Sequence, residues 1–182
     1  MHPIAIPATA YKRPARALHW FVALAVLATI PVGALMVEPG WPRPVQNAMF
    51  VFHKNLGVVI LMLMVVRLAY RLANPPPPLP AALPAMQRRI AGATHAALYL
   101  LVFVMAVSGY VRVAAGGFPL EGLDALGIPR LVPRSDALAA SAKAVHAYAR
   151  LPLVALILAH VGAAVWHGVV RRDGVFARMW PR

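Results

Sequence analysis

The chain has 182 residues, of which 61% are hydrophobic and 13% charged, and its mean hydropathy is +0.69. Soluble domains are about 45–50% apolar and about 25% charged, so this composition excludes an ordinary soluble domain and indicates a membrane protein. The 18 basic residues outnumber the 5 acidic ones, but they sit between apolar segments, where membrane topology and anionic lipid explain them better than nucleic acid does. The absence of cysteine excludes disulfides, thiolate metal sites and covalently attached c-type haem within the chain.

Long apolar segments organise the chain as a single membrane domain over residues 1–182. A membrane-spanning helix needs about 20 largely apolar residues. The segments that meet this need predict an all-α integral membrane protein, a bundle of four transmembrane helices: Ala17–Val37, Phe50–Leu72, Ile90–Ala114 and Val145–Val170. The Pro-rich linker Asn74–Pro84 cannot be helical, the connection Ala115–Ala144 is expected to cap the bundle, and no internal repeat is evident.

The distribution of charge predicts the orientation in the membrane. The predicted inner side carries 11 of the 18 basic residues, so both termini are expected in the cytoplasm of a bacterial cell, with the helices crossing the inner membrane. These residues are Lys12, Arg13, Arg16, Arg67, Arg71, Arg88, Arg89, Arg171, Arg172, Arg178 and Arg182. The other side carries four of the five acids, which are Glu38, Glu121, Asp124 and Asp136.

Histidines are the strongest functional signal, because ionisable groups inside membrane helices are costly and usually functional. Six of the seven fall in or at the ends of the segments: His19, His53, His95, His146, His160 and His167. His146 and His160 are fourteen residues apart, which places them about 21 Å apart along one face of a helix. At matching depths, His53 is the expected partner of His146 near the outer surface, and His19 or His95 is the partner of His160 near the inner surface.

Two stacked pairs of imidazoles are what two haems with bis-histidine ligation need, and such ligation suits electron transfer. A zinc or copper site is the rival metal site, and it is disfavoured because the pairs lie at different depths without cysteine. A proton relay would usually need carboxylates inside the membrane, and the segments have none. A haem-free transporter or channel is a further alternative, against which stand the paired histidines and the lack of an inverted repeat.

Several stretches, which together cover nearly the whole length, resemble a known family. They are the ALHW opening of the first helix, FVFHKNLGVVILMLMVVRLAYRL, THAALYLLVFVMAVSGY, KAVHAYA, LILAHVGAAVWH and the tail RRDGVFARMWP. In these stretches the chain resembles the bacterial cytochrome b561 family. The architecture is also similar to that of the cytochrome b subunits that anchor hydrogenases and formate dehydrogenases.

The resemblance implies two non-covalent haem b groups and quinone chemistry in the respiratory chain. Carried over by position, His53 and His146 would bind the iron of the outer haem, and His19 and His160 that of the inner haem. His95 would be an alternative ligand or part of a quinone site, where it is our candidate for delivering protons. Some family members oxidise superoxide at the outer face and reduce ubiquinone, which makes this activity an expectation for the chain.

Other charged residues have a functional and a structural interpretation. Arg67 shares a stripe with His53 at inner-haem depth, and Arg150 follows His146 by one turn. Each could pair with a haem propionate or lie at the headgroups. Lys143 could attract superoxide to a positive outer mouth or belong to an ordinary basic rim, together with Lys54, Arg112, Arg130 and Arg134.

The sequence therefore predicts a di-haem oxidoreductase that passes electrons between an outer-face donor and the quinone pool, with superoxide:ubiquinone oxidoreductase as the specific candidate. The alternative is a haem-bearing anchor subunit that exchanges electrons with a partner dehydrogenase or c-type cytochrome. His167 is expected at the headgroups, and His2 is expected to be disordered.

Overall fold

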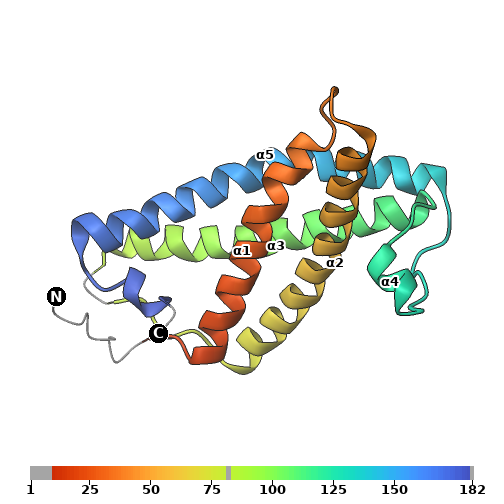
Figure 1. Ribbon diagram of the computed structural model, residues 1–182. Helices are drawn as coiled ribbons and strands as arrows, with labels where there is room; N and C mark the ends of the chain where they lie inside the picture. Colours follow the sequence, from red (N-terminus) through yellow and green to blue (C-terminus); the bar gives the residue numbers. More distant parts are fainter. Residues whose placement is uncertain (1–9, 81–82, 181–182) are drawn as a thin grey trace.

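The computed structural model describes residues 10–80 and 83–180, and within these residues every regular element is a helix (Figure 1). The long helices are α1 (Arg13–Leu35), α2 (Arg43–Ala73), α3 (Ala85–Ala115) and α5 (Asp136–Val165), which continues as the π-helix η1 (Trp166–Arg171). Two short elements complete the fold, α4 (Glu121–Ala125) and the 3₁₀ turn η2 (Phe176–Arg178). Four helices are long and apolar enough to cross a membrane, as predicted. His2 and Arg182 lie outside the described residues.

The helices begin before the apolar segments that predict them. The largest difference is at α5, which begins at Asp136 and not at Val145. Ser135 caps it by accepting a hydrogen bond from the amide of Leu138, and the alanine-rich first turns favour a helix without being apolar enough to be counted as membrane-spanning. The connection expected at Ala115–Ala144 therefore contains α4 and the first turns of α5.

The bundle consists of two antiparallel hairpins, α1 with α2 and α3 with α5, which cross each other in Figure 1. Contacts between α2 and α3 join the hairpins. At one end of the bundle Lys12 donates a hydrogen bond to the side chain of Asn74, and Arg178 donates to the carbonyls of Pro77 and Pro78. This end, where the first and last described residues meet the Pro-rich linker, is called the termini end below, and the opposite end is called the α4 end.

The apolar residues are arranged as a membrane protein requires. The core is small and contains Val22, Ile60, Met64, Val102, Ala106 and Leu153. Many larger side chains point outward instead, such as Leu24, Leu100 and Leu158, which are 59%, 64% and 67% exposed. In water such exposure would be unfavourable, whereas in a bilayer the same residues are solvated by lipid chains.

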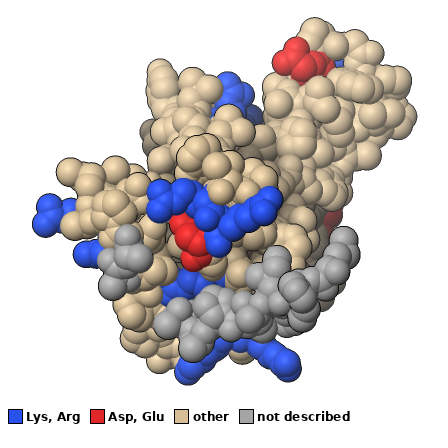
Figure 2. Space-filling view, turned by 90° about the vertical axis from the view of Figure 1, so that its left-hand side faces the viewer, with Lys and Arg blue, Asp and Glu red and all other residues tan. Residues whose placement is uncertain are grey.

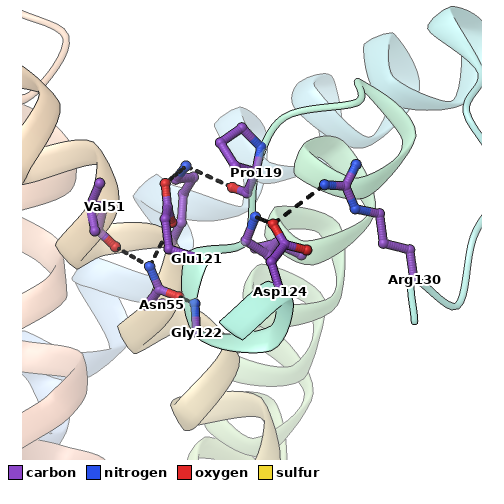
Figure 3. Close-up of polar contacts among 9 residues, drawn as sticks. Val51, Asn55, Pro119, Glu121, Gly122, Asp124 and Arg130 are labelled. Atoms are coloured by element: carbon purple, nitrogen blue, oxygen red, sulfur yellow. Dashed lines mark hydrogen bonds and ion pairs between the residues drawn. The ribbon is translucent and has the colours of Figure 1, made fainter. Parts of the chain in front are cut away.

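The short helix α4 is fastened to α2 by a cluster of polar contacts, shown in Figure 3. The ammonium of Lys54 lies 2.7 Å from the Glu121 carboxylate and also donates to the carbonyl of Pro119. Asn55 donates to Glu121 and accepts from the amide of Gly122, both at 2.8 Å. Burial raises the pKa of the Glu121 carboxyl, but the hydrogen bonds from Lys54 and Asn55 and the Lys54 charge together hold it below the ordinary value of 4.5.

We expect the attachment of α4 to weaken in acid. Because the pKa of Glu121 is lowered in the folded state, its contribution is present above pH 4.5 and is lost as the pH falls through the folded pKa. Glu121→Gln should speed hydrogen exchange at the Gly122 amide several-fold at pH 7 and remove the acid dependence. Glu38→Gln is the matched control, since Glu38 forms no ion pair within the described residues. Equal exchange in both variants would contradict the expected role of Glu121.

Candidate haem-binding sites

Near the α4 end, the helices bring His53 of α2 and His146 of α5 together, as the sequence predicts. Their ring centroids are 6.2 Å apart and their planes are nearly perpendicular, at 81°. Each ring is anchored through Nδ1, which lies 3.2 Å from the carbonyl of Thr29 for His53 and 3.0 Å from that of Met105 for His146. A carbonyl can only accept, so Nδ1 carries the proton in both rings and Nε2 keeps its lone pair.

Each of these rings lies against a glycine of the neighbouring helix. A Cβ atom on Gly33 would lie 2.5 Å from Cε1 of His53, and one on Gly109 would lie 3.2 Å from Cε1 of His146. Thr29, whose carbonyl accepts from His53, lies four positions before Gly33. Met105, whose carbonyl accepts from His146, lies four positions before Gly109. Glycine therefore lets the imidazole approach the helix backbone closely enough to hydrogen bond to it.

Near the termini end, three imidazoles gather instead of two. The ring of His160 is 6.2 Å from that of His19 and 5.4 Å from that of His95, and both contacts are edge to face. The choice between His19 and His95 as the partner of His160, which the spacing leaves open, is therefore not decided by proximity. The His19–His160 separation does equal the separation of the pair at the α4 end.

Arg67 lies within this cluster, at the depth that its spacing from His53 predicts. Its Nη2 is 3.0 Å from Nδ1 of His19, and its guanidinium lies over the ring of Tyr99 at 5.0 Å. Because arginine can only donate, His19 accepts through Nδ1 and carries its proton on Nε2. For His19 to bind a metal through Nε2, Arg67 must exchange this hydrogen bond for another acceptor.

One spacing recurs in all four long helices, and the sequence analysis used it in only two of them. His19 precedes Gly33, His53 precedes Arg67, His95 precedes Gly109 and His146 precedes His160, in each case by fourteen residues. The α1–α2 and α3–α5 hairpins thus share one register, in which the first helix carries histidine and glycine and the second carries histidine and a second nitrogen side chain. This interval is the signal in the sequence that points to Gly33 and Gly109, because the two hairpins do not resemble each other in sequence elsewhere.

The remaining predicted residues fall into different environments. Arg150 and Lys143 are exposed, and Arg112 is half-buried within electrostatic range of both His53 and His146. Lys54, for which a positive outer mouth and an ordinary basic rim were the two interpretations, forms an ion pair with Glu121. Arg130 is likewise 3.6 Å from Asp124. Within the described residues Arg112, Lys143 and Arg150 form no ion pair, so their charge near the pair is not neutralised by an acidic side chain.

His167, which is expected at the headgroups, contacts an acidic residue that follows α5. Its Nδ1 lies 2.6 Å from the Asp173 carboxylate, which also receives Arg171 at 3.8 Å. Partial burial raises the pKa of the Asp173 carboxyl, but the hydrogen bonds from His167 and the Val175 amide, together with the nearby Arg171 charge, lower it overall. Figure 2, which looks onto this end of the molecule, shows lysine and arginine side chains spread around a small acidic group.

The histidine pairs fit the axial positions of haem iron. Metal–imidazole bonds are about 2 Å long, and since the nitrogen lies about 1 Å from its ring centre, two imidazoles on opposite sides of one iron have centroids about 6 Å apart. Both 6.2 Å pairs agree with this distance. At the α4 end each histidine donates a hydrogen bond from Nδ1 to a backbone carbonyl, and metal-bound histidines usually make such a bond with the nitrogen that faces away from the metal. Within the described residues no group of three or more histidine or acidic side chains could hold a bare metal ion, which disfavours zinc or copper.

A four-helix membrane protein with an imidazole pair near each end has the architecture of a membrane b cytochrome. The sequence matches the profile of prokaryotic cytochrome b561 over residues 10–182, and the chain belongs to this family. It is 33% identical over 168 residues to cytochrome b561 homolog 2 of Escherichia coli K12, covering 90% of this chain and 87% of the relative.

Two further relatives cover similar shares. Cytochrome b561 homolog 1 of Escherichia coli K12 is 31% identical over 174 residues, which are 91% of this chain and 93% of the relative. A Yersinia pestis protein named "Probable superoxide oxidase CybB" is 27% identical over 165 residues, which are 91% of this chain and 92% of the relative.

The close approach of each histidine ring to a glycine, Gly33 for His53 and Gly109 for His146, is called the glycine notch, and it can be tested by adding one methyl group. We expect Gly33→Ala to displace His53 and to reduce the haem bound per chain, because the new Cβ overlaps the ring. Gly57→Ala, on the helix that carries His53, is the control, since a Cβ there meets nothing within 4 Å; it should keep all haem and gain up to about 1 kcal/mol of helix stability. The haem-to-protein ratio of each purified variant gives the answer, and an unchanged ratio in Gly33→Ala would show that the notch tolerates a methyl group.

Proposed function

We propose that the chain is a transmembrane di-haem b cytochrome that passes electrons between a donor at the α4 end and the quinone pool at the termini end. It would lie in the bacterial inner membrane with both termini in the cytoplasm. The observation that carries the proposal is the pair of imidazoles near each end of the bundle, with centroids 6.2 Å apart and nearly perpendicular planes in both. Bis-histidine ligation closes the iron to oxygen and suits electron transfer.

The chain's own residues supply the ligands and their surroundings. His53 and His146 would hold one haem, and His160 with His19 the other, with His95 as the alternative ligand. When bound, each haem supplies one-electron chemistry at an iron with both axial positions filled. Arg67 and Arg150 would pair with haem carboxylates, and such an acceptor would allow Arg67 to release His19. The apolar core between the two histidine levels keeps water and ions out of this region.

Quinone reduction consumes two electrons and two protons, so a proton donor is needed beside the haem at the termini end. His95 is half-buried with its ring 5.4 Å from that of His160, and we assign it this role. A histidine suits it because its proton exchanges near neutral pH. The termini end would face the cytoplasm, from which these protons would come.

The specific activity that we propose is superoxide:ubiquinone oxidoreductase. Two superoxide anions would each lose one electron and leave as dioxygen, while one ubiquinone gains both electrons and two protons. The name of the Yersinia pestis relative supports this choice. So do Arg112 and Lys143, whose positive charge near the His53–His146 pair would attract a small anion.

Substitution of the histidines tests the di-haem assignment. We expect His53→Ala and His146→Ala each to remove one of two low-spin haems and spare the other. His95→Ala should keep both haems and slow quinone reduction at least ten-fold, since it removes the proton donor and no ligand. The haem-to-protein ratio and the reduced-minus-oxidised spectrum measure both effects. Loss of a haem in His95→Ala would make His95 a ligand, and wild-type protein without haem would refute the proposal.

Removal of a charge tests the reaction with superoxide. We expect Lys143→Gln to slow superoxide oxidation several-fold at low ionic strength and to flatten its salt dependence, because steering of an anion depends on unscreened positive charge. Arg89→Gln removes the same charge from an exposed site at the termini end and should change neither. If the wild-type protein carries both haems but does not react with superoxide, it would instead be an anchor subunit that takes electrons from a partner protein.

A further inference from the structure

Arg16 is a buried charge with incomplete hydrogen bonding. It lies in the first turns of α1 and is 6% exposed. Its Nη1 donates to the carbonyl of Trp180 at 3.0 Å, whereas its buried Nε has no hydrogen-bond partner. A guanidinium has five N–H donors, and a neutral carbonyl does not compensate its charge. Burial of such a group is unfavourable unless an anion pairs with it.

No side-chain carboxylate of the described residues pairs with Arg16. It contains only 5 acidic residues against 18 basic ones. At the termini end Asp173 is already bound by His167 and Arg171. Within the described residues no ion pair includes Arg16. The anion that completes this site is therefore not a side-chain carboxylate of the described residues.

Arg16 borders the histidine cluster at the termini end. It precedes His19 by three residues, so the two side chains leave α1 within about 60° of each other. Trp20 links them to the tail, since its ring is 5.7 Å from that of His19 and 5.6 Å from that of Trp180. Trp20 also donates to the carbonyl of Met179 at 2.8 Å. These contacts hold the tail over Arg16 and separate it from solvent.

We propose that Arg16 binds a propionate carboxylate of the haem at the termini end, and is thus a cofactor-binding residue beyond those that the histidine pattern reveals. This inference rests on the proposed function, because it assumes a haem between His160 and its partner. Guanidinium and carboxylate match in charge and can pair through two hydrogen bonds. The carbonyl of Trp180 occupies one nitrogen of Arg16 and leaves Nε to the carboxylate.

The experiment compares Arg16→Gln with Arg13→Gln, which removes an exposed charge one turn earlier on the same helix. Both are made in the full-length chain and again with His53→Ala, so that the remaining haem is the one at the termini end. Redox titration of each variant at several pH values gives the midpoint potential. We expect Arg16→Gln to lower the potential of that haem and make it more dependent on pH, because a buried cation favours the reduced iron and keeps the carboxylate ionised. Arg16→Lys should restore part of the shift.

A second measurement separates a carboxylate partner from a general effect of charge. The apoprotein is reconstituted with haem b dimethyl ester, which has no ionisable propionate. In this form Arg16→Gln and wild type should have the same pH dependence. Unchanged potentials in Arg16→Gln with normal haem would overturn the inference, as would a pH dependence that persists with the ester. Loss of bound phospholipid phosphorus without a change in potential would show that Arg16 binds a lipid phosphate, which also overturns it. These outcomes all presume bound haem, so failure of the proposed function is distinguished by the haem-to-protein ratio of the wild type.

Discussion

An imidazole buried among apolar helices must hydrogen bond through at least one nitrogen, and helix carbonyls are the acceptors most readily at hand. These carbonyls are normally shielded by side chains, so a close approach requires a residue without a Cβ. Gly33 and Gly109 provide this approach for His53 and His146. The distance between α1 and α2 therefore depends on how the ring of His53 fits against the backbone of α1. The distance between α3 and α5 depends in the same way on the ring of His146 and the backbone of α3.

The scarcity of acidic residues shapes both ends of the molecule. Glu121 is used to attach α4, Asp124 pairs with Arg130, and Asp173 binds His167. These pairs leave a large excess of cations with no acid in the chain to neutralise them. A protein of this composition is suited to hold anionic groups that it does not itself supply, whether carboxylates of a cofactor or small anions that arrive from solution.

Hydropathy predicts the four helices because lipid demands long apolar segments, and the fourteen-residue interval predicts which histidines share a level because helix geometry is regular. The helix ends are less predictable: the start of α5 depends on the Ser135 cap and on alanine propensity. The fit of His53 against Gly33 and the burial of Arg16 under the tail depend on contacts between segments far apart in the sequence. Such contacts have no local signature, so neither the glycine notch nor the covered arginine could be predicted.

Both imidazole pairs include a residue of α5, which contributes His146 to one and His160 to the other. During synthesis this helix is the last of the four to leave the ribosome, so a nascent chain with α1 to α3 in the membrane has half of each pair and neither complete. Insertion of α5 therefore completes both histidine pairs at the same time. Chains truncated before residue 136 would accordingly lose both pairs at once, which makes assembly of the histidine pairs an all-or-none step in the biogenesis of the protein.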